Sequence, residues 1–144
     1  MKIISILFII FAFYFGKPVK QINATMQEWV GGIGSAKGIN YTVTFIARKS
    51  SDKIIPIKAN LNNTKNLRFI ILKNNKKLSN NFKFNKGDTL VLKCSYTKNL
   101  KQKNTSKQKI NTQKLYITFE YKKSKKTKTI EVTKFKKLKT LMYP

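Results

Sequence analysis

The sequence predicts an all-β protein: an antiparallel β-sandwich with an immunoglobulin-like layout of about seven strands, preceded by a signal peptide. Three observations predict this class. Several short segments alternate apolar and polar residues with a period of two, and turn-forming residues separate them about every eight to twelve positions. After the amino-terminal leader, no segment carries apolar residues at helical spacing over three turns. A small β-barrel is the alternative architecture.

Residues 1–24 are predicted to be the signal peptide. An uninterrupted apolar run at residues 3–15 lies between Lys2 and Gly16, which is the order of charge, apolar core and breaker typical of such leaders. A run of this length is too short to cross a bilayer as a helix, which needs about 20 apolar residues. The sequence therefore predicts export to the periplasm or the extracellular space, with no transmembrane span after cleavage.

Cleavage is expected after Ala24, which leaves residues 25–144 as one β-sandwich domain. An uncleaved membrane anchor is the alternative, because no clean small-x-small site follows the apolar run.

The first two strands are predicted on either side of residue 50, after a flexible glycine-rich loop at residues 31–38. Residues 39–47 form the first, with Tyr41, Val43, Phe45 and Ala47 on its core face. Residues 54–61 form the second. Because Pro56 has no N–H to donate to a ladder, this strand is expected at a sheet edge or at a bulge.

The remaining strands are predicted at residues 67–73, 81–84, 89–96, 114–121 and 128–135. The strand at 67–73 is apolar at nearly every position and is expected to be central. Turns are expected at Asn74–Asn75 and at Gly87, which tolerate positive φ. Residues 97–113 are nearly all polar, so they are predicted to be a mobile basic loop. Residues 122–127 are the expected tip of the last hairpin, and a bulge is expected near Thr133 or Lys134.

The chain contains no histidine and a single cysteine. Without histidine, Ser-His-Asp and Cys-His catalytic arrangements and nearly all zinc sites are excluded. With one cysteine, an intramolecular disulfide is excluded. Cys94 alternates with apolar residues, which indicates a buried small apolar side chain rather than a reactive thiol. No catalytic residue, cofactor site or metal site is predicted.

The sequence offers two further candidate sites, and both are disfavoured. Pairing Phe119 with Val132 would place Glu120 opposite Glu131, which is the carboxylate pair that glycoside hydrolysis uses, but nearby lysines favour a solvated face. The glycine-rich segment at 31–38 matches neither the dinucleotide fingerprint nor a Walker A loop, so it is interpreted as a connector.

The chain is strongly basic, with 31 Lys and Arg against five acids. Three of the 31 precede residue 25, so the domain after the leader would carry a net charge of +23. The electric field of a protein with this net charge attracts anionic polymers and membranes. A bias toward A/T-rich codons explains the lysine content equally well, since only Arg48 and Arg68 are arginines.

The densest basic feature is the sequence KKSKKTK at residues 122–128. Its lysines are the candidate anion-binding residues: Lys122, Lys123, Lys125, Lys126 and Lys128. They could lie on lipid headgroups or on a polyanion. The alternative is a solvated tip that discourages edge-to-edge aggregation. Nucleic-acid binding is disfavoured, because arginine and exposed aromatic residues are scarce.

Four short motifs carry a family resemblance. They are Trp29 before GGIGSAKG, the Tyr41-x-Val43-x-Phe45 strand, Lys86-Gly87-Asp88 before a strand, and the closing Phe135-x-x-Leu138-x-x-Leu141-x-Tyr143-Pro144. Together they span most of the residues after the leader. They resemble small exported β-sandwich proteins of unknown function from Bacteroidota-type bacteria. The resemblance implies an envelope or secreted location and brings no catalytic or binding residue.

Two hypotheses for function follow. The first is a non-enzymatic structural or interaction module of the bacterial envelope, whose partner is an envelope protein or an anionic surface. The second is a cationic binder of anionic lipid, lipopolysaccharide or polysaccharide through the lysine-rich hairpin. A hydrolase is the disfavoured third hypothesis.

Overall fold

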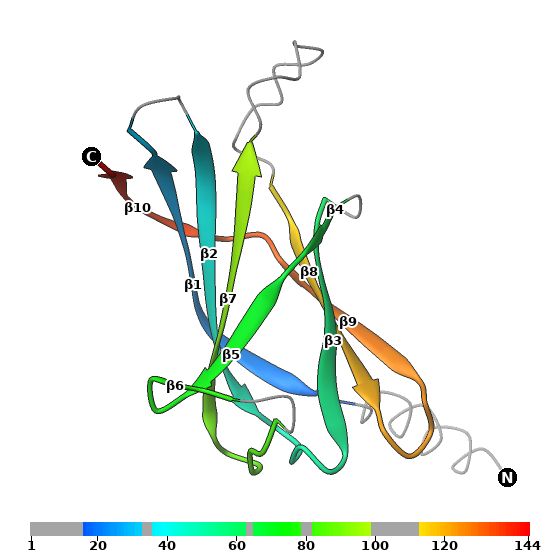
Figure 1. Cartoon of the computed structure of the whole chain (residues 1–144). Helices are drawn as coiled ribbons and strands as arrows, with labels where there is room; N and C mark the ends of the chain where they lie inside the picture. Colours follow the sequence, from blue (N-terminus) through cyan, green and yellow to red (C-terminus); the bar gives the residue numbers. More distant parts are fainter. Residues whose placement is uncertain (1–15, 33–35, 63–64, 79–81, 99–112) are drawn as a thin grey trace, which may run out of the picture.

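The computed structural model describes residues 16–32, 36–62, 65–78, 82–98 and 113–144. Over these ranges the chain forms strands, turns and irregular segments, and contains no helix. The strands assemble into two sheets that face each other (Figure 1). The predicted all-β class with a sandwich of mostly antiparallel strands is therefore confirmed. Within the described ranges, no helix is long and apolar enough to span a membrane.

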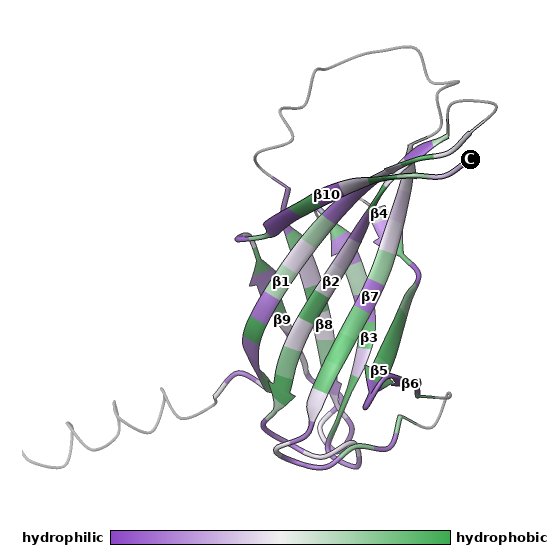
Figure 2. Cartoon of the chain, turned by 90° about the vertical axis from the view of Figure 1, so that its left-hand side faces the viewer, coloured by the Kyte–Doolittle hydropathy of each residue, from purple (hydrophilic) through white to green (hydrophobic). Residues whose placement is uncertain are grey.

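Sheet A has six strands in the order β10-β1-β2-β7-β5-β6. Their bounds are Lys136–Met142, Val19–Val30, Lys37–Ala47, Thr89–Lys98, Phe69–Lys73 and Lys76–Lys77. Sheet B has four strands in the order β4-β3-β8-β9. Their bounds are Lys65–Leu67, Ile54–Leu61, Leu115–Tyr121 and Thr127–Val132. Figure 2 shows sheet A in front of sheet B, with hydrophilic and hydrophobic bands following one another along the strands.

Strand β1 begins well before the expected start of the domain. It runs from Val19, so the expected boundary at Ala24 falls inside the strand. Val19 and Ala24 are 2% and 4% exposed and belong to the core. This strand is not recognisable from the sequence pattern, because a bulge between Gln21 and Asn23 shifts the register against β2 and breaks the period of two.

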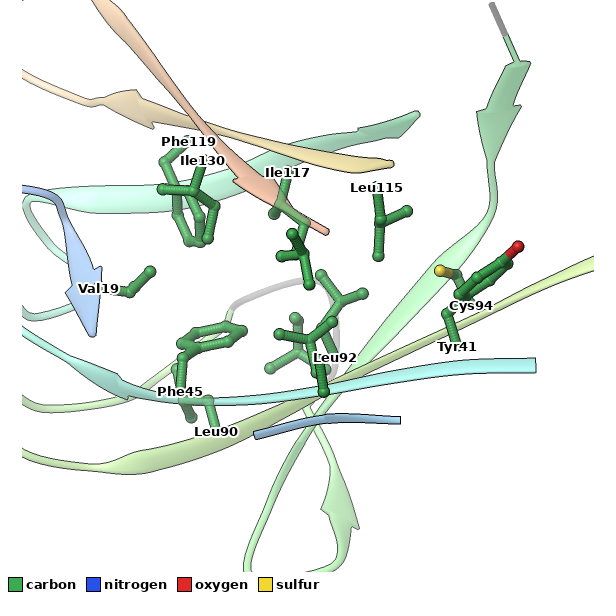
Figure 3. Close-up of a cluster of buried hydrophobic side chains, with 14 of the residues drawn as sticks. Val19, Tyr41, Phe45, Leu90, Leu92, Cys94, Leu115, Ile117, Phe119 and Ile130 are labelled. Carbon is green, nitrogen blue, oxygen red and sulfur yellow. The ribbon is translucent and has the colours of Figure 1, made fainter. Parts of the chain in front are cut away.

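The core lies between the two sheets. The predicted inward positions of β2, from Tyr41 to Ala47, are fully buried. Phe45 of sheet A meets Phe119 of sheet B edge to face, with ring centroids 5.9 Å apart (Figure 3). Aromatic pairs in this geometry contribute about 0.5–1.5 kcal/mol beyond the area that they bury. This contact therefore joins the two layers across the core.

Strand β10 is absent from the sequence prediction. The expected strand at 128–135 ends at Val132, and three residues without regular structure follow before β10 begins at Lys136. Phe135 in this break packs edge to face on Tyr41, with centroids 5.4 Å apart. Strand β10 then pairs in parallel with β1. The expected bulge near Thr133 is thus the break at which the chain passes from sheet B to sheet A.

The predicted central strand at 67–73 is divided between the two sheets. Its first part belongs to β4 in sheet B and its second to β5 in sheet A, with Arg68 between them. Only the two-residue strand β6 lies outside β5, so β5 is close to an edge rather than central. The expectation for Pro56 is confirmed, because the register of β3 against β8 shifts between Pro56 and Lys58.

Residues 82–84 form no strand, contrary to the prediction for 81–84, and Asn81 lies outside the described residues. Phe84 is nevertheless 3% exposed and anchors this segment in the core. The turn predictions hold, since Asn74, Asn75 and Gly87 all have positive φ. Most of the predicted loop, residues 99–112, lies outside the described residues.

Candidate functional site

The lysine-rich turn, residues 122–126, joins β8 to β9. The Tyr121 amide donates to the Lys126 carbonyl at 2.8 Å, and the Lys125 amide donates to the Tyr121 carbonyl at 2.8 Å. Lys125 has a φ of 56°, a conformation that lysine adopts rarely. These bonds hold the turn in a closed form, so its lysines project from a fixed backbone.

The structure brings four of the five candidate lysines together and separates the fifth. Lys122, Lys123, Lys125 and Lys126 lie on the turn, and every residue from 122 to 129 is exposed. Lys128 lies in β9 opposite Phe119, on the side of the sheet that faces the core, at the open edge of sheet B. The compact part of the site is therefore the turn.

Few carboxylates neutralise the turn. Within the described ranges, Lys125 is the one turn lysine with a salt bridge, at 3.4 Å from Glu120. Three other acids of the chain bind lysines elsewhere, in the pairs Asp88–Lys73, Glu131–Lys114 and Glu28–Lys137. Exposed ion pairs of this kind contribute about 0–1 kcal/mol each. The turn thus keeps most of its positive charge available to an external anion.

The loop between β2 and β3, residues 48–53, lies against the lysine-rich turn. The Lys122 amide donates to the Lys53 carbonyl at 2.9 Å, and Lys49 Nζ lies 5.7 Å from the centre of the Tyr121 ring. No pattern in the sequence marks this loop as part of the site. The two segments are distant in sequence, so only the pairing of β3 with β8 brings them together.

The carboxylate pair considered from the sequence does not form. Strands β8 and β9 pair Glu120 with Thr127 and Glu131 with Tyr116, so the proposed pairing of Phe119 with Val132 is wrong by four residues. Both registers place apolar residues on one face, because a shift of four preserves the period of two. The short turn decides between them, since it brings Tyr121 next to Lys126.

Cys94 is buried as predicted, at 5% exposure. Burial raises the pKa of its thiol to about 12, so the thiolate is scarce near neutral pH. Among the described residues, no group of three or more acids, cysteines or histidines could hold a metal ion.

The glycine-rich segment joins β1 to β2, and residues 33–35 of it lie outside the described residues. The Gly31 amide donates to the Ala36 carbonyl at 2.7 Å, and β2 follows at Lys37. The segment thus leads directly into a strand, unlike the loops that place a helix N-terminus at a phosphate.

Comparison with other proteins finds no family model, no curated protein and no solved structure that matches the chain.

Proposed function

We propose that the protein is an exported, non-enzymatic module of the bacterial envelope that acts by binding, and that its lysine-rich turn contacts an anionic surface. The proposal includes the signal peptide, the immunoglobulin-like layout and the periplasmic or extracellular location expected from the sequence. The apolar run at 3–15 supports export. Two facing sheets around one core support the layout.

The observation that carries the binding proposal is the concentration of exposed charge on the turn. Four lysines project within five residues. Among the described residues, Lys125 is the one of them in a salt bridge, and Lys122 lies near enough to the Asp52 carboxylate for their charges to interact. Each lysine close to an anionic surface contributes about 1 kcal/mol of attraction. Together they favour binding by several kcal/mol at low salt.

The absence of histidine from the sequence and the separation of Glu120 from Glu131 support the non-enzymatic part of the proposal. A reproducible turnover activity that disappears in Glu120→Gln or Glu131→Gln would overturn it.

The test measures binding of the full chain, as cells process it, to vesicles of phosphatidylcholine with and without phosphatidylglycerol. Binding to the anionic vesicles should fall steeply as salt rises. Replacing all five candidate lysines by glutamine should weaken it more than a hundredfold at low salt.

The matched control replaces five exposed lysines away from the turn by glutamine: Lys37, Lys93, Lys134, Lys136 and Lys139. This variant has the same net charge as the test variant and should keep most of the affinity. Equal losses in the two variants would show attraction by net charge alone and would contradict a role for the turn. Tight binding to lipopolysaccharide or polysaccharide with none to vesicles would replace lipid as the ligand.

A further inference from the structure

Three segments that are distant in sequence meet at one corner of the sandwich, which we name the amino-terminal corner: residues 16–18, 48–53 and 122–126. The Arg48 amide donates to the Pro18 carbonyl at 3.0 Å, and the Lys122 amide donates to the Lys53 carbonyl at 2.9 Å. Figure 1 shows the start of β1 and the β8–β9 turn at the same end of the sandwich, with the C terminus at the opposite end.

The amino-terminal corner is more basic than the lysine-rich turn alone. Its three segments contain eight Lys or Arg and one acid, Asp52. Lys17, Arg48 and Lys53 are exposed there and lie outside the turn. The positive charge therefore extends from the turn to the point where the described chain begins.

The apolar run at residues 3–15 connects to the fold at this same corner. Val19 opens β1 and is 2% exposed, so residues 16–18 are the whole connection between the run and the folded core. Three residues span at most about 10 Å. The Debye length at physiological salt is about 8 Å. A bilayer that holds the apolar run would thus lie close enough to attract the exposed cations of the corner.

We infer that the amino-terminal corner is the surface with which the folded protein rests on a bilayer containing anionic phospholipid, with the C-terminal end pointing away. This inference rests on the proposed function and deepens it: Lys17, Arg48 and Lys53 join the turn, and the orientation is fixed. It takes the uncleaved anchor in place of the removed signal peptide, because cleavage after Ala24 would cut β1 and remove Lys17 together with the apolar run. A bilayer accounts for both features of the corner, since its interior receives the apolar run and its headgroups receive the cations. A dissolved polyanion accounts only for the cations.

Two measurements on the full chain with the same anionic vesicles test this inference. The first compares Lys17→Gln/Arg48→Gln/Lys53→Gln with a control of equal charge, Lys93→Gln/Lys136→Gln/Lys139→Gln. The control lysines are exposed and lie in β7 and β10. Each cation of the corner should contribute about a fivefold factor. The test variant should therefore bind about a hundredfold more weakly, and the control less than about fivefold more weakly.

The second measurement reads orientation from tryptophan quenching by spin-labelled lipid. The native Trp29 is the single tryptophan and lies next to Tyr143, near the C-terminal end. Ser124→Trp adds a probe at the exposed tip of the turn. The added probe should be quenched on vesicle binding, and Trp29 should not.

The outcomes separate this inference from the proposed function. If the five-lysine variant loses binding while the Lys17/Arg48/Lys53 variant retains it, or if Trp29 is the quenched residue, the orientation is wrong and the binding function survives. If the wild-type chain prefers anionic over neutral vesicles at no salt concentration, both fail.

Discussion

The indole ring of Trp29 in β1 covers Gly38, its direct partner in β2. A β-carbon added at Gly38 would clash with Trp29 Cε2, because it would stand closer to that atom than real contacts allow. Tyr143 meets the same indole edge to face, with centroids 6.2 Å apart. Gly38 is not among the residues with positive φ, so the glycine provides room for the ring rather than an unusual backbone conformation. An aromatic ring over a glycine of the neighbouring strand also helps to fix the register.

Gly38→Val should therefore destabilise the fold. The added side chain would displace the indole, and overpacking of this kind costs about 1–3 kcal/mol. Denaturant unfolding followed by circular dichroism and by the fluorescence of Trp29 measures the loss. The control is Ser95→Val, which adds the same branched side chain at an exposed position of β7 and should change stability by less than about 0.5 kcal/mol. Equal stability of the two variants would show that the ring moves aside freely.

Truncation at the expected cleavage site should disrupt the sandwich. A chain that begins at Thr25 lacks the first half of β1, including Val19, which alone contributes about 1.5–3 kcal/mol of burial. It also loses the pairing of β1 with the end of β2, from Val43 to Ala47. A chain that begins at Lys17 keeps these contacts and should melt cooperatively at a clearly higher temperature. Equal melting temperatures would mean that residues 17–24 are dispensable and that cleavage after Ala24 is compatible with the fold.

The sequence predicts the class of the fold well where strands alternate without interruption. Strand β2 is the clearest case, because its four predicted core residues are all buried. The prediction fails where a bulge or a change of sheet breaks the period, as in β1 at Gln21–Asn23 and at Arg68 between β4 and β5. Strand β10 is missed for another reason. Its partner β1 is more than a hundred positions away, three of its seven residues are lysines, and most of its residues are exposed.

The candidate site is predicted in part. Composition locates the lysine-rich turn, because a run of lysines between two strands is visible in one segment. The contributions of Lys17, Arg48 and Lys53 are not visible, since they depend on which loops share one end of the sandwich. The alternation of apolar and polar residues likewise does not determine the register of two strands, because any even shift keeps the apolar residues on one face.

The ion pair between Asp88 and Lys73 should make stability depend on acid pH. Lys73 Nζ lies 2.6 Å from Asp88 Oδ2, and this hydrogen bond is the main reason why the pKa of Asp88 lies below its usual value. A lowered pKa in the folded state stabilises the protein above the unfolded value of about 3.9, and this stabilisation is lost as the pH falls through the folded-state pKa. Asp88→Asn should therefore melt below the wild type at neutral pH, and the difference should shrink below about pH 4.

Thermal unfolding of both proteins across the acid range measures this effect. The control is Lys73→Gln/Asp88→Asn, which should melt close to Asp88→Asn, because the charge of Lys73 acts through Asp88. A difference between Asp88→Asn and the wild type that persists unchanged at the lowest pH would show that the effect does not come from the ionised carboxylate and would contradict this prediction.

Engineered cysteines should report the register of the β8–β9 hairpin directly. Thr118 and Thr129 are direct partners, with their hydroxyl oxygens 2.9 Å apart, so Thr118→Cys/Thr129→Cys should form a disulfide in air. Glu120→Cys/Glu131→Cys should not, because four residues of offset separate these positions by about 13 Å along the strand. Mass spectrometry and thiol titration distinguish the products. The native Cys94 does not interfere, since its buried thiol, with a pKa of about 12, exchanges slowly. Rapid closure of the Glu120/Glu131 cysteine pair would restore the register in which the two carboxylates face each other, and with it the possibility of acid–base chemistry on this face.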